Sequence, residues 1–508
     1  MLNEYYRHLK SGTDIRGIAV DGVLNEPVTL TDDVAEAVGY GFAAWLKENC
    51  KPGSGERFTV ALGHDSRVSA ERLAKAITEP MLRCGINIKD CGLASTPAMF
   101  MTTVNFDCDA AVEITASHHP FNRNGFKFFT KQGGLEGEDV ESILEYAQNG
   151  DRPIASEVGE RTETPYMNEY AKGLRDMICE GINADDYSRP LRGFHIVVDA
   201  GNGVGGFYAT KVLEPLGADI TGSQFLEPDG MFPNHMPNPE NEEAMASISE
   251  AVVREGADFG VIFDTDVDRA ACVDENGRSI NRNALIALAS CIALEGNEGG
   301  TIVTDSVTSA GLKDFIENEL GGKHWRFKRG YRNVINEAKR LNLEECVNAP
   351  LAIETSGHAA MRDNYFLDDG AYLITQIIIK AATLRKEGRT LGSLIEKLVE
   401  PVEACEYRIG ITADDFGAYG NMVIDSLTKF IESCKEYELA TDSREGIRAE
   451  KKEADGWFLL RLSVHDPVLP LNIESNMEGG TKNILSDLLK FFGQFPCLET
   501  SCFNGEEE

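Results

Sequence analysis

The sequence predicts an α/β fold followed by a smaller α+β region. Short apolar strands alternate with helical stretches over most of its 508 residues. Such alternation is typical of parallel sheets with crossover helices on their faces. The C-terminal part differs, because residues 457–473 have alternating strand character and residues 481–492 carry apolar side chains at helical spacing.

Three strand–helix pairs carry the α/β prediction. They are a strand at 58–63 with a helix at 70–84, a strand at 193–199 with a helix at 207–216, and a strand at 301–304 with a helix at 312–320. No low-complexity linker separates them. We predict four domains, over residues 1–165, 166–285, 286–400 and 401–508.

The charge balance excludes several classes of partner. The chain has 49 basic and 83 acidic residues, a net charge of −34. So acidic a surface argues against nucleic acid or an anionic membrane as a partner. The N-terminus lacks an apolar signal region, and the twelve cysteines form no C-x-x-C pair. We expect a cytoplasmic protein with reduced thiols, monomeric or homodimeric.

The first candidate site is the run Thr115-Ala116-Ser117-His118-His119-Pro120, which follows the strand-like residues 110–114. A serine at a strand end beside cationic side chains can accept a phosphoryl group. His118, and Lys127 ten residues after the serine, can neutralise charge and move protons. Taken alone, the run is equally consistent with a polar turn.

The second candidate site is Asp264-Thr265-Asp266-Val267-Asp268-Arg269, directly after a buried-strand pattern at 258–263. Three carboxylates at alternate positions offer oxygen-only ligation for a hard cation such as Mg²⁺. The glycine and distant glutamate of a calcium-binding EF-hand are absent. The alternative is a solvated acidic turn, which the apolar strand before the acids disfavours. Arg269 can clamp phosphate oxygens.

Two further polar segments follow apolar strands. In Glu354-Thr355-Ser356-Gly357-His358, expected on a strand-to-helix turn, polar groups can recognise sugar hydroxyls, or Thr355 or Ser356 can cap a helix. In Arg461-Leu462-Ser463-Val464-His465, three polar side chains can hold a phosphate dianion. Locally, an ordinary hairpin turn explains the second segment better.

Together the four segments resemble the α-D-phosphohexomutases, the family of phosphoglucomutase, phosphomannomutase and phosphoglucosamine mutase. Their order and spacing match the family pattern from about Gly12 to Ser475. In that family a phosphoserine passes its phosphate to a hexose phosphate, and the bound bisphosphosugar returns its other phosphate. The resemblance implies three similar α/β domains around a central cleft, with a smaller C-terminal α+β domain.

The resemblance also implies a role for each matching residue. Ser117 is similar to the phosphoserine, and with Asp264, Asp266 and Asp268 it would bind Mg²⁺. The implied catalytic residues around the transferring phosphate are Arg16, His118, Lys127 and Arg269. The implied substrate contacts are Gly330, Tyr331, Glu354, Ser356, His358, Arg461, Ser463 and His465. Local cations, with Arg329 among them, would offset the negative charge of the whole molecule.

The chain departs from the family pattern at three places. Thr265 and Val267 stand where glycine is frequent, at positions expected to be spacers. Val464 and His465 replace glycine or asparagine and then threonine, and a valine resists the positive φ that glycine permits. Thr355 is neither the methionine of glucose and mannose enzymes nor the residue of glucosamine enzymes.

We therefore expect a mutase that interconverts hexose 1-phosphate and hexose 6-phosphate, with glucose or mannose as the sugar and hexose 1,6-bisphosphate as activator and intermediate. Phosphoglucosamine mutase is the alternative within this class. A phosphosugar-binding regulator with little turnover, or a simple phosphatase, is the alternative from another class.

Several other segments are interpreted as structural. Residues 201–206 contain G-x-G-x-x-G between a strand and a helix, but no acid follows to bind a ribose, which favours a tight turn. Residues 63–69 are expected to form a strand-to-helix turn capped by Ser69, and residues 368–370 to support the sugar loop or start a helix. His195, His235 and His324 carry no motif.

Overall fold

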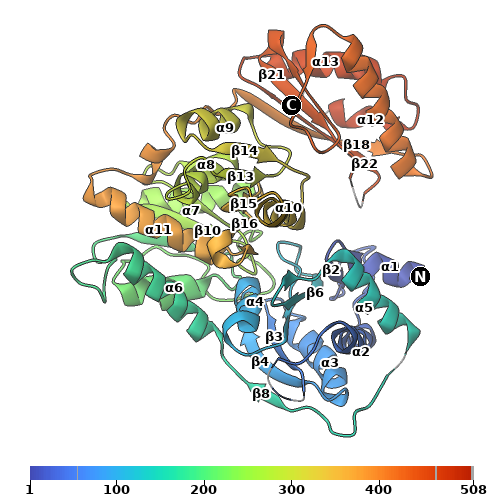
Figure 1. The fold of residues 1–508 in the computed structure, drawn as a ribbon, viewed down its shortest axis with the longest axis vertical. Helices are drawn as coiled ribbons and strands as arrows, with labels where there is room; N and C mark the ends of the chain where they lie inside the picture. The colour runs from blue at the N-terminus through green and yellow to red at the C-terminus, as the bar shows by residue number, and fades with distance from the viewer. Residues whose placement is uncertain (54, 56, 151, 464–465, 505–508) are drawn as a thin grey trace. The chain divides into compact units, whose positions relative to one another are not determined.

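The structure is a computed structural model that describes residues 1–53, 55, 57–150, 152–463 and 466–504. The chain forms two compact units (Figure 1). Unit 1 comprises Met1–Leu285 and Ser356–Ser393, and unit 2 comprises Ile286–Thr355 and Leu394–Glu508. The predicted α/β class with a C-terminal α+β domain is confirmed, except that the sheets are mixed rather than purely parallel.

The first sheet of unit 1 carries the Ser117 segment. Its strands are β1 (Lys10–Ser11), β2 (Asp14–Ile18), β6 (Arg123–Thr130), β5 (Ala110–Ile114), β3 (Thr59–His64), β4 (Asn87–Leu93) and β8 (Arg161–Glu163), in that order, with β7 (Gly133–Gly134) beside β6. Strands β5, β3, β4 and β8 are parallel, whereas β1, β2 and β6 pair in antiparallel register. Strand β5 is buried along its whole length.

Helices cover this sheet through one continuous core. Helices α2 (Asp32–Asn49), α3 (Ala70–Arg83) and α5 (Gly137–Asn149) pack together, and α1 (Glu4–Leu9) precedes β1. Phe42 of α2 meets Phe128 of β6 with ring centroids 4.7 Å apart. Helix α4 (Thr96–Asn105) packs on β5 and β6, and its first residue also reaches the aspartate loop.

The second sheet of unit 1 carries the aspartates. Its order is β12 (Ser279–Ile280), β11 (Ala270–Val273), β10 (Phe259–Phe263) and β9 (Ile196–Asp199), with only β9 and β10 parallel. Helix α7 (Glu242–Glu255) packs on β9 and β10, while α6 (Met167–Ile182) packs against α11 (Gly370–Lys386). A hairpin of β16 (Ala359–Met361) and β17 (Leu367–Asp368) completes the unit.

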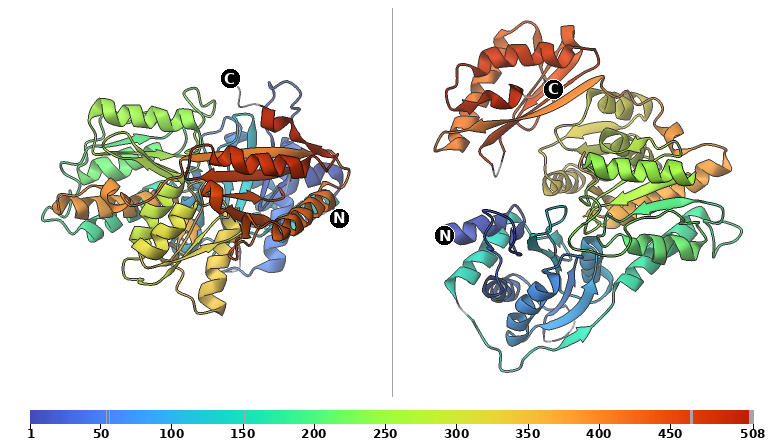
Figure 2. Two further views of the ribbon diagram at one scale, coloured as in Figure 1. Left: turned by 90° about the horizontal axis from the view of Figure 1, so that it is seen from above. Right: turned by 180° about the vertical axis from the view of Figure 1, so that it is seen from behind.

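Unit 2 combines a parallel α/β part with an antiparallel sheet. In the first part, β14 (Lys323–Arg326), β13 (Thr301–Thr304) and β15 (Leu351–Ile353) are parallel, with α10 (Tyr331–Glu344) packed on them. The C-terminal sheet has the order β19 (Tyr437–Leu439), β20 (Ile447–Lys451), β21 (Gly456–Leu460), β22 (Val468–Ser475), β18 (Glu403–Ile411) and β23 (Leu498–Glu499). Helices α12 (Phe416–Ser433) and α13 (Gly480–Phe492), orange to red in Figure 2, share its core.

Two predicted helices have a different geometry. Residues 207–216 form a π-helix over Tyr208–Leu213 and a 3₁₀ turn over Glu214–Leu216, in which Pro215 supplies no N–H. The predicted helix 312–320 divides into α9 (Ala310–Asp314) and a π-helix (Phe315–Glu319). Helix α8 (Arg282–Ala293) follows β12. Among the described residues, no helix has both the length and the apolar character needed to cross a membrane.

Candidate active site

Ser117 follows β5 in a buried and sterically strained conformation. Its φ of 51° lies in the left-handed region, which costs a residue with a Cβ about 1–2 kcal/mol. The Ser117 N–H donates to the Thr115 hydroxyl at 2.8 Å, and Arg67 donates to the Ser117 carbonyl, so both neighbours hold the turn. Strain of this kind, held by surrounding contacts, is typical of functional sites.

The side chain of Arg67 organises the backbone around Ser117. Its guanidinium is buried and pairs with Asp65 at 3.2 Å. It donates to four carbonyl oxygens of the following loop, those of Ser117, His119, Pro120 and Arg123. Burial lowers the pKa of Arg67, and Asp65 opposes that shift. The segment 63–69 is therefore the support of the serine loop as well as a strand-to-helix turn.

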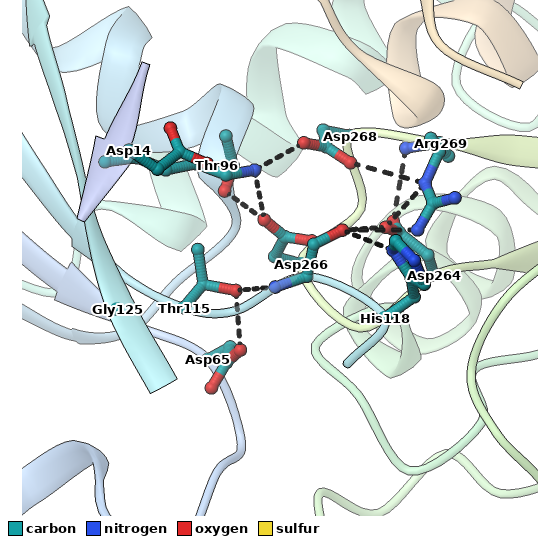
Figure 3. A network of polar contacts seen from close by, with 12 residues as sticks. Asp14, Asp65, Thr96, Thr115, His118, Gly125, Asp264, Asp266, Asp268 and Arg269 are labelled. Carbon is teal, nitrogen blue, oxygen red and sulfur yellow. Dashed lines mark hydrogen bonds and ion pairs between the residues drawn. The ribbon is translucent and has the colours of Figure 1, made fainter. Parts of the chain in front are cut away.

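Three aspartates occupy the loop between β10 and β11 (Figure 3). One ligand oxygen from each of Asp264, Asp266 and Asp268 lies within 4.8 Å of the other two, and all three residues are buried. Val267 has a φ of 66°, which a β-branched residue rarely adopts. Position 267 is therefore a sterically demanding turn position, not the spacer that we expected.

The donor set of this loop fits a hard divalent cation. The Oδ1 atoms of Asp266 and Asp268 are buried and accept no hydrogen bond from the described residues. A buried carboxylate oxygen without a partner is unfavourable, and a bound cation would satisfy it. Burial, followed by the charge of Asp268, raises the pKa of Asp264 well above its usual range. The three carboxylates can hold a metal ion together.

Lys127, on β6, partly neutralises the aspartate loop. Its Nζ donates to Asp266 Oδ2 at 2.8 Å and to Asp268 Oδ2 at 2.6 Å. Burial raises the pKa of Asp268, but Lys127 and then His358 outweigh it and lower that pKa. Lys127 stands directly opposite Glu113 in the β5–β6 register, and burial raises the pKa of Glu113 well above its usual range. The lysine is thus placed beside the predicted metal ligands.

Arg269 links Ser117 to the aspartate loop. Its Nη2 donates to Ser117 Oγ at 3.2 Å and its Nε to Asp264 Oδ2 at 3.0 Å. The Ser117 hydroxyl itself donates to Asp264 Oδ2 at 3.1 Å. On its other side, Arg269 Nη1 donates to Asn238 Oδ1 at 3.2 Å and lies 3.5 Å from Glu240. The guanidinium is 1% exposed, so its charge acts on Ser117 with little solvent screening.

Two histidines lie close to these groups. His118 Nδ1 is 3.4 Å from Ser117 Oγ, and burial, followed by the charge of Arg269, lowers the pKa of His118. His358 Nε2 is 3.7 Å from Asp268 Oδ1, and its Nδ1 is 2.9 Å from Ser356 Oγ. Burial lowers the pKa of His358 to about 3. Burial thus favours the neutral form of both imidazoles.

Arg16 lies on β2, opposite Gly125 of β6. Its Nη2 pairs with Asp14 at 2.7 Å, and its charge helps to lower the pKa values of His118 and His119. Unit 1 thus brings together these predicted residues: Arg16, Ser117, His118, Lys127, Asp264, Asp266, Asp268, Arg269, Ser356 and His358.

The other predicted substrate contacts belong to unit 2. Gly330 precedes α10 with a φ of 117°, and its N–H donates to Glu354 Oε1 at 2.6 Å. Tyr331 is the first residue of α10. The segment 354–358 joins β15 to β16, so the expected strand-to-helix turn is wrong. The Thr355 hydroxyl is buried and donates to Asp305 at 2.7 Å rather than capping a helix.

The fourth segment joins β21 and β22, as expected for a hairpin. Arg461 Nε is buried and has no hydrogen-bond partner among the described residues. Burial lowers the pKa of Arg461, and Glu445 opposes that shift. The Ser463 hydroxyl accepts a hydrogen bond from the Asp466 N–H at 3.2 Å. Val464 and His465 lie outside the described residues.

Thr96 and the glycine-rich run 201–206 contact the aspartate loop, which the sequence did not predict. Thr96, at the start of α4, donates to Asp266 Oδ2 at 2.5 Å. A Cβ at Gly203 would lie 2.6 Å from the Thr265 carbonyl oxygen, so the glycine-rich run allows close packing on the aspartate loop. Ser69 occupies the N-cap position of α3, yet its hydroxyl accepts from Asn124 instead of capping. Asp369 starts α11 by accepting from the Tyr372 N–H.

A strained serine, a buried arginine and three converging carboxylates define a site suited to phosphoryl transfer. Comparison with known proteins agrees. Models of the phosphoglucomutase/phosphomannomutase family match residues 9–152 as alpha/beta/alpha domain I, 168–277 as domain II and 281–402 as domain III. The chain therefore belongs to the phosphoglucomutase/phosphomannomutase family and is an intramolecular phosphotransferase.

Individual relatives match over nearly their whole length. The chain is 31% identical to a phosphoglucomutase/phosphomannomutase of Thermococcus kodakarensis, over 92% of this chain and 95% of the relative. It is 29% identical to a phosphoglucomutase of Neisseria meningitidis, over 94% of this chain and 95% of the relative. A crystal structure of a family protein from Burkholderia thailandensis gives a TM-score of 0.78 at 24% identity, covering 97% of this chain and 98% of the other.

Proposed function

We propose that this enzyme interconverts the 1-phosphate and 6-phosphate of glucose and mannose through a phosphate carried on Ser117. The observation that supports this most strongly is the setting of the Ser117 hydroxyl, which contacts Asp264, Arg269 and His118. A phosphate there would meet one buried guanidinium and lie beside the three carboxylates. The names of the relatives support glucose and mannose as the sugars.

The chain's own groups would divide the work around Ser117. Arg269, with Arg16, neutralises phosphate oxygens, and this stabilisation is strong because the guanidinium of Arg269 is buried. Lys127, with His118 beside the serine, moves the proton between the serine and the sugar hydroxyl. Asp264, Asp266 and Asp268 would hold Mg²⁺, which when bound supplies charge neutralisation at the phosphate.

The remaining predicted residues would hold the sugar. We assign Glu354, Ser356, Gly330, Tyr331 and His358 to the hydroxyls, and Arg461, Ser463 and His465 to the distal phosphate. A hexose 1,6-bisphosphate formed on the enzyme would present its second phosphate to Ser117. Because the Thr355 hydroxyl donates to Asp305, position 355 would not distinguish glucose, mannose and glucosamine.

The test is a coupled assay of glucose 6-phosphate formed from glucose 1-phosphate, with Mg²⁺ and catalytic glucose 1,6-bisphosphate, and the same assay with mannose 1-phosphate. Turnover should require the bisphosphate and disappear in Ser117→Ala, while Ser142→Ala, on the exposed side of α5, keeps it. Phosphate release without isomerisation would indicate a phosphatase. Binding without turnover on glucose, mannose or glucosamine phosphate would favour a regulator.

A further inference from the structure

His235 occupies a position with a chemical task that the sequence does not reveal. Its side chain is 2% exposed, and its Nε2 lies 3.0 Å from each carboxylate oxygen of Asp199. Its Nδ1 lies 3.0 Å from the Met236 carbonyl oxygen. Both ring nitrogens therefore face acceptors, an arrangement that only the doubly protonated imidazolium satisfies.

Asp199 is itself firmly held at the end of β9. Its Oδ1 accepts from the Gly201 N–H at 2.9 Å, and its Oδ2 accepts from Gln224 Nε2 at 2.8 Å. Gly201 has a φ of 52°, and a Cβ there would lie 2.7 Å from Pro237. The glycine thus lets the segment after His235 approach β9 closely. These contacts fix the position of the carboxylate that pairs with His235.

The contact that leads towards the active site is the Met236 carbonyl. The same oxygen accepts the Asn238 N–H at 2.8 Å, so the imidazolium and the Asn238 backbone share one acceptor. The Asn238 side chain accepts from Arg269 Nη1, and Glu240, two residues later, lies 3.5 Å from the same nitrogen. Arg269 Nη2 in turn donates to Ser117 Oγ. A continuous path of contacts thus joins His235 to the Ser117 hydroxyl oxygen.

We propose that His235 is a positioning residue: its imidazolium fixes the turn 236–238, so that Asn238 and Glu240 aim the Arg269 guanidinium at the oxygen of Ser117. This inference rests on the proposed role of Ser117 as phosphate carrier. His235 touches neither substrate nor the reacting atoms. Its effect passes through the orientation of one buried cation, which misplacement by a small distance would weaken.

The charge state of His235 gives this role a distinct pH dependence. Burial opposes the charged imidazolium, but Asp199 and the Met236 carbonyl outweigh it and raise the pKa of His235. The titratable groups that face the ring are Asp199 from β9 and Glu243 from α7, and Phe225 contacts it edge-on. As the pH rises through the raised pKa, one N–H is lost. Nε2 keeps its proton because it faces the Asp199 carboxylate. Nδ1 loses its proton, so the hydrogen bond to the Met236 carbonyl is lost.

The test compares wild type with His235→Gln, Asn238→Ala and the double variant. His195→Gln is the matched control, because His195 directly precedes β9 and its ring lies 2.8 Å from the Thr221 carbonyl oxygen. We expect kcat to fall about tenfold in each single variant, with KM within about twofold. The fall of kcat at alkaline pH should flatten in both single variants. The kcat of the double variant should be no lower than that of the more strongly affected single variant.

The structural readout is independent of sugar turnover. A crystal structure of His235→Gln should show the Arg269 Nη2–Ser117 Oγ hydrogen bond broken or clearly longer than 3.2 Å. An unmoved guanidinium would overturn the inference, as would additive losses in the double variant. If His235→Gln does not fold, Asp199→Asn replaces it, and its alkaline limb should move to lower pH. Failure of wild type to isomerise any phosphosugar would refute the proposed function, whereas the guanidinium position would still decide this inference.

Discussion

Replacing Arg67 by methionine should loosen the loop that carries Ser117 more than it affects any other part of the protein. Methionine keeps much of the side-chain volume but removes the cation. The change leaves the buried Asp65 carboxylate uncompensated and takes a donor from four carbonyl oxygens. Breaking one partner of a buried pair costs about 3–5 kcal/mol, and buried acceptors that lose a charged donor add to this. We expect a local loss of about 4 kcal/mol.

The assay is amide hydrogen exchange, because it reports the opening of this loop separately from the rest of the chain. A loss of about 4 kcal/mol corresponds to roughly a thousandfold faster exchange at residues 115–126. Arg161→Met is the control, because Arg161 is 51% exposed in its ion pair with Asp90. A surface pair of that kind contributes about 1 kcal/mol or less. Equal exchange of residues 115–126 in the two variants would refute the reasoning.

Four further predictions concern the site and its stability. Ser117→Gly should be more stable than Ser117→Ala by about 1 kcal/mol in denaturant unfolding, because both lack the hydroxyl and only glycine relaxes the φ of 51°. Mg²⁺ should raise the unfolding temperature of wild type but not of Asp266→Asn, followed by calorimetry, and an equal rise in both would place the metal elsewhere. Arg461→Ala should raise KM for the phosphosugar at least about tenfold, whereas Arg408→Ala, which breaks an exposed pair with Asp466, should not, as steady-state kinetics would show. Burial raises the pKa of Asp369 to about 6, so between pH 4 and 6 the folded protein holds a proton that the unfolded chain has lost. The stability of wild type relative to Asp369→Asn should therefore fall as the pH rises from 4 to 6. Unfolding titrations should show a fall of up to about 3 kcal/mol.

The sequence predicted those site residues that directly follow an apolar strand pattern. Asp264, Asp266 and Asp268 follow a strand of apolar residues, so their convergence could be predicted from spacing alone. Ser117 follows β5 in the same way. The strand starts were predicted within a few residues, because buried strands consist of short apolar runs. The four domain boundaries stay a prediction.

What the sequence could not reveal depends on contacts between distant residues. Arg67 acts on carbonyl groups about 50 residues away, and no local pattern marks an arginine for that task. His235 looked structural, because its importance arises from a turn whose side chains reach Arg269. Thr355 was a candidate helix cap, but its hydroxyl donates to Asp305. The π-helix at 208–213 departs from a pattern that favours an α-helix, which shows tertiary packing prevailing over local propensity.

The most direct test of the central claim follows the phosphate itself. The enzyme would be labelled with isotopic phosphate from a labelled hexose bisphosphate, freed of sugar, and mapped by peptide mass analysis before and after one turnover with unlabelled glucose 1-phosphate. We predict label on Ser117 before the turnover and in the sugar phosphates after it. Label on another residue, or label on Ser117 that leaves only as inorganic phosphate, would contradict the account.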